Sequence, residues 1–258
     1  MQEYSSDRSA QVEESREFSE NTGGEGGIPN LSAAKLKSAM HLLPALVVAV
    51  IAYLLGSIPF GFLLVRIFRK EDIRTLGSGN IGATNVVRSG AKGLGALTFL
   101  LDAAKGYLAV YAATRLLFGF AFSPSPPVEV LAGLPAIAGL FAVLGHMYPV
   151  WLRFKGGKGV ATSFGVFLAL SPQAALAGLA IFVVVFVIWR YVSLASIVSG
   201  IAFTIAALLI SRGQQTAFFT AVVVLIPALV TLKHHQNIRR LLKGAEYRFG
   251  KPRPEKSA

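Results

Sequence analysis

The 258-residue chain contains no cysteine and comparatively few charged residues. The lack of cysteine excludes disulfide bonds, thiolate nucleophiles and cysteine-ligated metal sites. Charged side chains make up 15% of the sequence, against about a quarter in soluble domains. Hydrophobic residues make up 53%, and the mean hydropathy is +0.59. This composition indicates a membrane protein.

Acidic residues are scarce beyond the N-terminal region. Residues 1–34 hold seven Asp and Glu against two Lys and Arg, with many Ser, Gly and Asn. Residues 1–40 are therefore expected to be a disordered acidic tail, which lacks the short apolar core of a cleaved signal peptide. Residues 35–258 carry 23 basic against six acidic side chains. That excess suits anionic lipid headgroups and phosphorylated small molecules, and in a membrane protein it does not indicate nucleic acid.

Seven hydrophobic segments predict an all-α membrane protein with seven transmembrane helices, in a domain of residues 41–250 followed by a basic tail, 251–258. The fourth segment is short for a full crossing, which leaves open a re-entrant or broken helix. In the first segment Gly56 and Pro59 predict a break, with Ser57 bonding the backbone groups freed there. The segments are 43–67, 94–118, 128–150, 159–171, 173–191, 194–211 and 215–233.

The distribution of basic residues predicts the orientation of these helices. If all seven cross, the loops on one side hold 18 Lys and Arg and those on the other side hold six. The positive-inside rule then places the N-terminus outside and the C-terminus in the cytoplasm. The glycine-rich polar loops 71–92, 153–159 and 233–250 all fall on the cytoplasmic side and are expected to form an active site there.

Residues 77–88, GSGNIGATNVVR, have the composition of an oxyanion-binding loop. Glycines let successive N–H groups point into one concavity, and Arg88 supplies a planar fork for phosphate oxygens. The alternative is a flexible connector, but connectors seldom alternate Gly with Asn, Ser and Thr and then end in Arg. Candidate phosphate-binding residues in this loop are Gly77, Asn80, Thr84 and Asn85.

Lys158 stands within a Gly-Gly-Lys-Gly run directly before a predicted helix. A glycine loop, a lysine and a helix N-terminus are usual components of a phosphate site. The run is not a Walker A loop, because no Ser or Thr follows Lys158 directly. Its glycines, Gly156, Gly157 and Gly159, are therefore expected to bind phosphate through their amides.

The ionisable residues Asp102, Lys105 and His146 lie inside predicted spans. Asp102 and Lys105 are three residues apart, so they share a helix face and can neutralise each other. A structural pair and a site pair remain equally open, and Lys105 is retained as a candidate phosphate ligand. His146, near the end of the third span, is expected to be a structural hydrogen-bonding residue.

Four polar residues near the predicted cytoplasmic face complete the candidate set. Ser193 is expected to cap the sixth helix, and Ser196 lies one turn further in, where a helix-to-helix hydrogen bond is the alternative to a site role. His234 and Asn237 share a face of an amphipathic helix. Metal binding by His234 and its neighbour His235 is disfavoured, because adjacent histidines point different ways and no third ligand is evident.

Four motifs, in this order and spacing, resemble the bacterial acyl-phosphate:glycerol-3-phosphate acyltransferases. They are Gly77–Arg88, Gly145–Thr162, the Arg-x-x-Ser-x-x-Ser run Arg190–Ser196, and His234–Phe249. The resemblance covers roughly residues 45–250. It implies seven membrane helices in the bacterial inner membrane, an N-terminus outside, and an active site open to the cytoplasm.

The resemblance implies transfer of a fatty acyl group from acyl-phosphate to the 1-hydroxyl of sn-glycerol 3-phosphate, giving lysophosphatidate and inorganic phosphate. Both substrates, together with membrane lipid, are the expected partners. No cofactor or metal is expected, and the acyl chain length and oligomeric state stay open. The family's functional positions correspond here to Ser78, Arg88, Lys158, Ser196, His234 and Asn237.

The sequence leaves several alternatives open for the site and the function. Two phosphates require two anion pockets, and the sequence does not decide which loop binds which. Either His234 or the substrate phosphate takes the hydroxyl proton, and the second is favoured because no carboxylate is evidently paired with His234. An anion transporter is the rival function, although its polar residues would be expected on both faces or in an inverted repeat. An acyl-CoA enzyme with an H-x-x-x-x-D motif is disfavoured, since no histidine has Asp five positions later.

Overall fold

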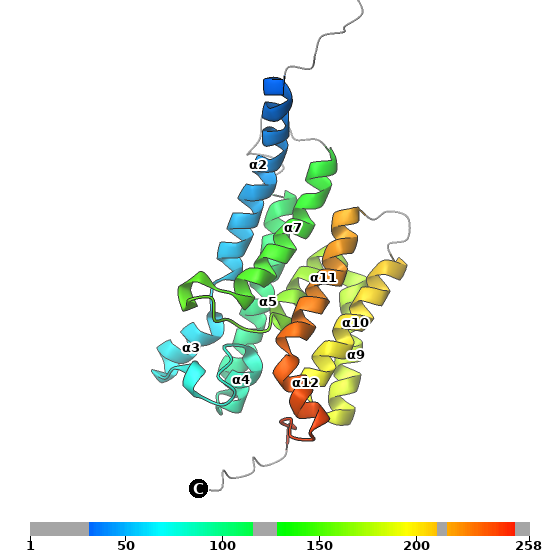
Figure 1. Ribbon diagram of the computed structural model, residues 1–258. Helices are drawn as coiled ribbons and strands as arrows, with labels where there is room; N and C mark the ends of the chain where they lie inside the picture. Colours follow the sequence, from blue (N-terminus) through cyan, green and yellow to red (C-terminus); the bar gives the residue numbers. More distant parts are fainter. Residues whose placement is uncertain (1–30, 116–127, 211–215, 251–258) are drawn as a thin grey trace, which may run out of the picture. The chain divides into compact units, whose positions relative to one another are not determined.

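A computed structural model describes residues 31–115, 128–210 and 216–250, and every regular element in these ranges is a helix (Figure 1). The contacts divide the chain into two units, Met1–Met40 and His41–Ala258, and the description below concerns the second. Residues 31–40 belong to a helix, which differs from the disordered tail expected through residue 40. Residues 1–30, 116–127 and 211–215 and the predicted basic tail 251–258 lie outside the described residues.

Each of the seven predicted hydrophobic segments contains a helix. The first is split into two helices, and shorter helices lie in the polar loops. The long helices are α2 (Leu31–Gly56), α3 (Phe60–Arg69), α5 (Lys92–Arg115), α7 (Val128–Met147), α8 (Val160–Leu170), α9 (Pro172–Trp189), α10 (Val192–Ile210) and α11 (Ala217–Lys233). The short ones are η1 (Ile73–Thr75), α4 (Ala83–Arg88), η2 (Val150–Leu152) and α12 (His235–Leu242).

The described helices provide five or six candidate membrane spans. Five stretches are long and apolar enough to cross, and α11 with α12 makes a sixth if this pair, bent by 59°, counts as one span. Helix α8 has 11 residues, or about 16 Å at 1.5 Å per residue, against a hydrocarbon core of about 30 Å. The predicted shortness of the fourth segment is confirmed, and the count of seven crossings stays a prediction.

The break predicted in the first span is confirmed between α2 and α3. The helix stops at Gly56 and resumes at Phe60. The expected role of Ser57 is wrong, because its buried hydroxyl has no hydrogen-bond partner among the described residues. Instead, Nζ of Lys105 on α5 donates to the carbonyl oxygen of Ile58 at 2.7 Å, and so bonds a backbone group freed by the break.

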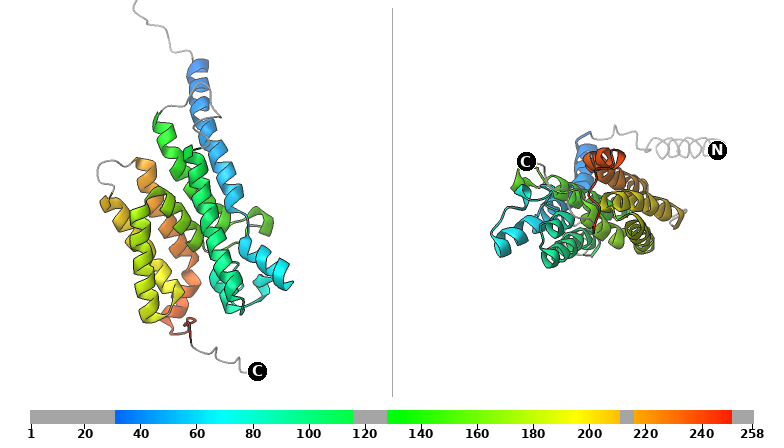
Figure 2. Two further views of the ribbon diagram at one scale, coloured as in Figure 1. Left: turned by 180° about the vertical axis from the view of Figure 1, so that it is seen from behind. Right: turned by 90° about the horizontal axis from the view of Figure 1, so that it is seen from below.

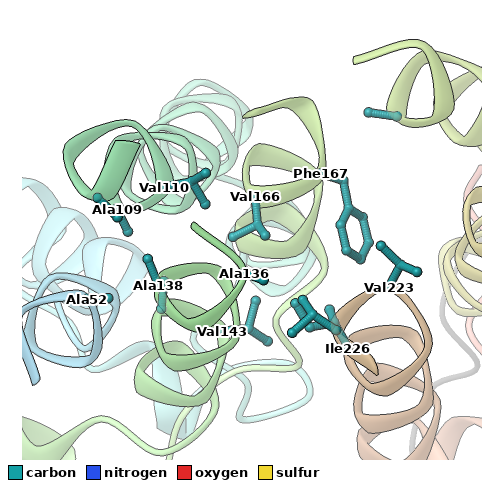
Figure 3. Packing of buried hydrophobic residues seen from close by; sticks show 14 of the residues in the cluster. Ala52, Ala109, Val110, Ala136, Ala138, Val143, Val166, Phe167, Val223 and Ile226 are labelled. Carbon is teal, nitrogen blue, oxygen red and sulfur yellow. The ribbon is translucent and has the colours of Figure 1, made fainter. Parts of the chain in front are cut away.

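Small residues allow the central helices to approach closely. Helices α5 and α8 meet at Gly106 and Gly165, where an added Cβ would overlap the backbone of Thr162 and Ala103. Close backbone contact of this kind is a common way to pack helices in membranes. Helices α9 and α10 likewise pack side by side (Figure 2). Branched and aromatic side chains fill the core between α5, α7, α8 and α11, where Phe167 points toward Val223 (Figure 3).

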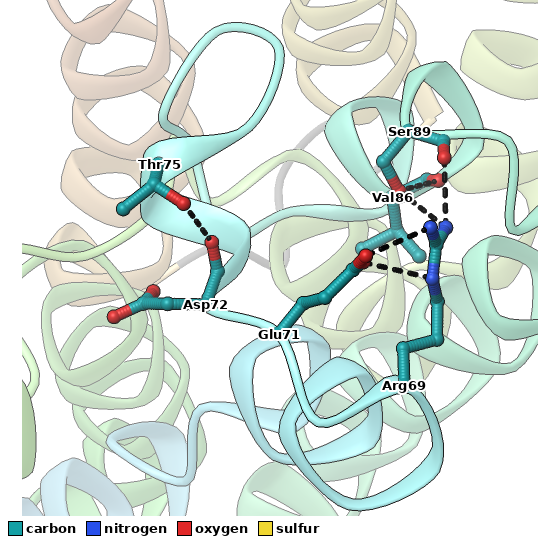
Figure 4. A network of polar contacts seen from close by, with 6 residues as sticks. All are labelled: Arg69, Glu71, Asp72, Thr75, Val86 and Ser89. Atoms are coloured by element: carbon teal, nitrogen blue, oxygen red, sulfur yellow. Dashed lines mark hydrogen bonds and ion pairs between the residues drawn. The ribbon is translucent and has the colours of Figure 1, made fainter.

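A second, smaller core supports the polar loop between α3 and α5. Its buried residues are Val65, Ile73, Ile81, Val86 and Leu152. At its edge the Arg69 guanidinium donates to the carbonyl oxygen of Ser89 at 2.7 Å and pairs with Glu71 at 2.9 Å (Figure 4). These contacts fasten the end of α3 to the end of α4. The loop that precedes α4 is therefore held on a packed base.

Candidate active site

One cavity of about 210 Å³ gathers residues from all three predicted polar loops. Its polar part includes every residue predicted to be catalytic, namely Ser78, Arg88, Lys158, Ser196, His234 and Asn237. Its apolar part is lined by side chains of α5, α8, α9 and α10, namely Phe99, Phe164, Phe167, Leu179, Phe182 and Phe203. The cavity is thus suited to a molecule with a charged head and an apolar tail.

Asn85 shapes the first loop. Its buried side-chain oxygen accepts from the Ser78 N–H at 2.7 Å, and its Nδ2 donates to the carbonyls of Ile73, Leu76 and Asn80 at 2.8–3.2 Å. These bonds use the amide donors that were expected to contact phosphate. Asn85 lines the cavity, but its hydrogen bonds are made within the loop.

Two further predicted residues of this loop also act on its conformation. Gly77 has φ +57°, in the left-handed region that glycine adopts without strain, and a Cβ there would overlap the Asn85 side chain. The Asn80 side-chain oxygen accepts from the Gly82 N–H at 2.9 Å, directly before α4. Asn80 and Thr84 line the cavity, and Gly77 does not.

The second loop passes closely against His146. The Gly157 N–H donates to the His146 carbonyl at 3.0 Å, so this amide is not available to phosphate as had been expected. A Cβ on Gly157 would overlap the His146 imidazole, and one on Gly156 would overlap the His146 carbonyl and Pro149. Gly156 and Gly157 therefore permit close packing, whereas Lys158 and Gly159 reach the cavity together with the first turn of α8.

A buried charge cluster lies behind this loop. Oδ1 of Asp102 is 2.8 Å from Nζ of Lys105 and 3.5 Å from Nδ1 of His146, and all three side chains are nearly inaccessible. Lys105 also bonds Ile58 and does not line the cavity. The structure therefore favours the structural interpretation of the Asp102–Lys105 pair over a phosphate-binding role for Lys105. His146 lines the cavity and its Nδ1 makes no hydrogen bond within the described residues, so its expected structural role stays a prediction.

Lys158 is the cation at the centre of the polar part. Its Nζ donates to Oδ1 of Asn237 on α12 at 2.5 Å. Burial lowers the pKa of Lys158 to about 8; nearby Glu246 opposes this change, whereas Arg240 and Arg88 add to it. A lysine at this pKa is largely protonated at neutral pH and loses its charge in the mildly alkaline range.

Glu246 joins the elements around Lys158. Its Oε1 accepts from Nδ2 of Asn237 at 2.6 Å and from the Ser193 hydroxyl at 2.9 Å, and its Oε2 accepts from Nε of Arg240 at 2.7 Å. Burial opposes ionisation, but the three hydrogen bonds hold the pKa of Glu246 below its ordinary value. The expected capping role of Ser193 is wrong, because α10 begins at Val192 and the hydroxyl bonds Glu246.

His234 is held in one tautomer by the backbone. Its Nδ1 lies 2.7 Å from the carbonyl oxygen of Val230, one turn earlier. A carbonyl only accepts, so Nδ1 carries the proton and Nε2 keeps its lone pair. The Ser196 hydroxyl donates to the Val192 carbonyl in its own helix at 2.8 Å, rather than to another helix.

Arg88, at the end of α4, faces an aromatic ring from the C-terminal segment. Its Cζ lies 4.2 Å from the centre of the Tyr247 ring, within the range of a cation–π contact. Figure 1 shows α4 and α12 at the same end of this unit. The contact spans the space between the loop of residues 77–88 and the chain that follows α12.

Sequence reasoning missed the roles of Glu246 and Tyr247. Glu246 had a signal, because it is the only acidic residue between positions 130 and 254. A lone carboxylate in such a basic stretch is expected to have several cationic or donor partners. Tyr247 had no comparable signal. In the described residues no group of three His, Cys, Asp or Glu side chains is arranged to hold a metal ion.

Comparisons with known proteins agree on one family. The model of the family "Glycerol-3-phosphate acyltransferase" matches residues 46–244. The glycerol-3-phosphate acyltransferase of Myxococcus xanthus is 49% identical over 199 residues, covering 77% of this chain and 96% of that protein. The glycerol-3-phosphate acyltransferase of Rhodospirillum rubrum is 46% identical over 212 residues, covering 81% and 94%.

Crystal structures of PlsY (YgiH), an integral membrane glycerol 3-phosphate acyltransferase, have a similar fold. The glycerol 3-phosphate form is 41% identical with a TM-score of 0.70, covering 80% of this chain and 96% of that one. The lysophosphatidic acid form gives a TM-score of 0.68 at the same identity, covering 80% and 95%. These similarities cover most of the helical unit that carries the cavity.

Proposed function

This chain belongs to the glycerol-3-phosphate acyltransferase family, and from that premise we propose that it transfers a fatty acyl group from acyl-phosphate to the 1-hydroxyl of sn-glycerol 3-phosphate. The products are lysophosphatidate and inorganic phosphate. One observation carries this proposal: Arg88 and Lys158 come from separate loops to a single cavity that phenylalanine and leucine side chains also line. The two cations match the two phosphates of the substrates, and the apolar part of the cavity matches one acyl chain.

The acyl donor's phosphate binds Lys158 and the first turn of α8. The amides of that turn have no partners within the helix, and its dipole favours an anion. Further along the same helix, Phe164 and Phe167 line the apolar part of the cavity. A donor held at the start of α8 can therefore lay its acyl chain along this helix.

The acceptor's phosphate binds Arg88 and the Ser78 hydroxyl. Ser78 is exposed and Arg88 is half-buried, so both are accessible to a soluble substrate. Asn80 and Asn85 contribute by holding the loop in shape. The basic loops around the cavity face the cytoplasm, where glycerol 3-phosphate is available, and seven crossings with the N-terminus outside give that orientation.

The chemistry needs little beyond positioning and charge stabilisation. The 1-hydroxyl oxygen attacks the acyl carbon, a new ester C–O bond forms, and the anhydride C–O bond to phosphate breaks. Lys158 stabilises the negative charge that collects on the departing phosphate. Because this phosphate leaves as a base, it takes the proton of the 1-hydroxyl, while Nε2 of His234 accepts a hydrogen bond from the neighbouring 2-hydroxyl and so orients the acceptor.

Purified protein in lipid tests this proposal directly. With acyl-phosphate and glycerol 3-phosphate it should release inorganic phosphate and lysophosphatidate in equal amounts without CoA. The same protein carrying Lys158→Ala is the matched control for spontaneous hydrolysis. Release of phosphate without lysophosphatidate, or uptake of glycerol 3-phosphate into liposomes with no product, would overturn the acyltransferase assignment in favour of hydrolysis or transport.

A further inference from the structure

Residues 244–249, here called the C-terminal strap, link parts of the cavity that the helices leave separate. Helix α4, which carries Arg88, packs chiefly against α5 and α3. The strap is instead fastened to the opposite wall. Glu246 bonds Ser193 of α10 and Asn237 of α12, and the Phe249 N–H donates to the Arg190 carbonyl, after α9, at 3.0 Å.

Tyr247 is the part of the strap that reaches α4. Its ring centre lies 4.2 Å from the Arg88 guanidinium carbon. The Tyr247 and Phe249 rings pack edge to face, with their centres 5.3 Å apart and their planes at 75°, and Phe249 packs in the same manner with Phe186 of α9. A row of three rings therefore extends from α9 to the guanidinium of Arg88.

We propose that Tyr247 is a positioning residue that orients Arg88 for the phosphate of the acyl acceptor. This inference rests on the proposed function, in which Arg88 binds that phosphate. A long arginine side chain has many rotamers, and fixing it costs entropy when the substrate binds. A ring against the guanidinium restricts those rotamers before the substrate arrives.

The chemistry of the contact suits this role better than a salt bridge would. An aromatic ring contacts the flat face of a guanidinium, whereas phosphate oxygens bind its N–H groups in the plane. A carboxylate in place of Tyr247 would compete for the same N–H groups and neutralise the charge. The ring can orient Arg88 without occupying its N–H groups.

Steady-state kinetics of Tyr247→Leu and Tyr247→Phe in lipid test the proposal. Tyr247→Leu should raise the KM for glycerol 3-phosphate about 2- to 10-fold, the range expected for losing one cation–π contact. The KM for acyl-phosphate should stay within error of the wild type, whereas the lost ring contact with Phe249 should lower the melting temperature slightly. Tyr247→Phe keeps the ring and should retain the wild-type KM.

The Arg88→Lys background separates positioning from packing. If Tyr247 acts through the guanidinium, adding Tyr247→Leu to Arg88→Lys should change the KM for glycerol 3-phosphate by less than about 2-fold. The proposal would be overturned if the double variant raised the KM for glycerol 3-phosphate by the product of the two single effects. Equal changes in both KM values of Tyr247→Leu would also overturn it. A wild-type protein without transferase activity would instead overturn the proposed function, so the two failures are distinguishable.

Discussion

The ammonium group of Lys158 donates a hydrogen bond to Oδ1 of Asn237, 79 positions further along the chain, at 2.5 Å. Nδ2 of the same amide donates to Glu246 at 2.6 Å. An amide suits this place because it accepts from a cation on one side and donates to a carboxylate on the other. Asn237 thereby joins the loop before α8 to α12 and the C-terminal strap, and it keeps Lys158 separated from the Glu246 charge.

The lowered pKa of Lys158 predicts an alkaline limit to activity. Below pH 8 the free enzyme carries the ammonium that we propose binds the donor's phosphate, and above about 8 it loses this charge. The ratio kcat/KM for acyl-phosphate should therefore fall about tenfold per pH unit above that value. Initial rates from pH 6 to 9.5, corrected for spontaneous hydrolysis, measure this.

Arginine at position 158 gives the matched comparison. Because arginine stays protonated throughout this pH range, Lys158→Arg should have a lower rate but no alkaline decline near pH 8. Lys155→Ala, which removes a neighbouring lysine outside the cavity lining, should keep the wild-type profile. An alkaline decline that persists in Lys158→Arg would assign the titration to another group.

Removing the Glu246 carboxylate should destabilise the folded protein. Glu246→Ala leaves the buried donors of Asn237 and Ser193 without their acceptor, at about 1–3 kcal/mol for each. Thermal unfolding in detergent should show a melting temperature several degrees lower. Arg239→Ala is the control: Arg239 is exposed on the same helix as Asn237, so its loss should cost under about 1 kcal/mol. Equal shifts in the two variants would contradict the central role of Glu246.

Much of the architecture is readable from local sequence. Hydrophobic length predicts the helical segments, and the Gly56–Pro59 run predicts the break between α2 and α3, because these signals act within one turn of chain. The grouping of Ser78, Arg88, Lys158, Ser196, His234 and Asn237 followed from the resemblance together with the charge asymmetry. The number of crossings is not fixed in this way, since the 11 residues of α8 span only part of a bilayer.

The roles of individual polar residues were less predictable, because they depend on partners distant in sequence. Gly157 and Asn85 occur in runs typical of phosphate loops, yet Gly157 packs against His146 and Asn85 bonds the loop backbone. Lys105 lies one helical turn after Asp102, which lines the cavity, but its ammonium donates to the Ile58 carbonyl in the break after α2. Composition indicates that a loop binds an anion. Only tertiary contacts distinguish the residues that can contact the anion from those that hold the loop in its conformation.

Adding one methyl group at Gly157 should displace the loop that carries Lys158. Gly157→Ala places a Cβ into the His146 imidazole, which Asp102 and the core hold in place. We expect the KM for acyl-phosphate to rise at least about tenfold, because a misplaced cation binds its anion poorly. Substrate titrations of the purified variant measure the change.

Gly93→Ala provides the control for Gly157→Ala. A Cβ at Gly93, in the first turn of α5, has no atom within 4 Å, and alanine favours the helix there. This variant should keep wild-type kinetics and equal or greater stability. If Gly157→Ala also kept the wild-type KM for acyl-phosphate, the close packing of Gly157 against His146 would not be required for placing Lys158.

As a neutral hydrogen-bond acceptor, His234 is expected to orient glycerol 3-phosphate. Its Nδ1–H is bonded to the Val230 carbonyl, so Nε2 presents a lone pair. Burial, together with the nearby Lys158 cation, lowers the pKa of His234 to about 4, which keeps the imidazole neutral. His234→Ala should lower kcat/KM for glycerol 3-phosphate about 10- to 100-fold, and His234→Gln, whose amide oxygen also accepts, should recover part of it. Recovery by glutamine distinguishes the roles, because glutamine can accept a hydrogen bond but cannot take a proton near neutral pH. An orienting His234 predicts that recovery. A general base would give none, and that result would assign the proton to His234 instead of the departing phosphate.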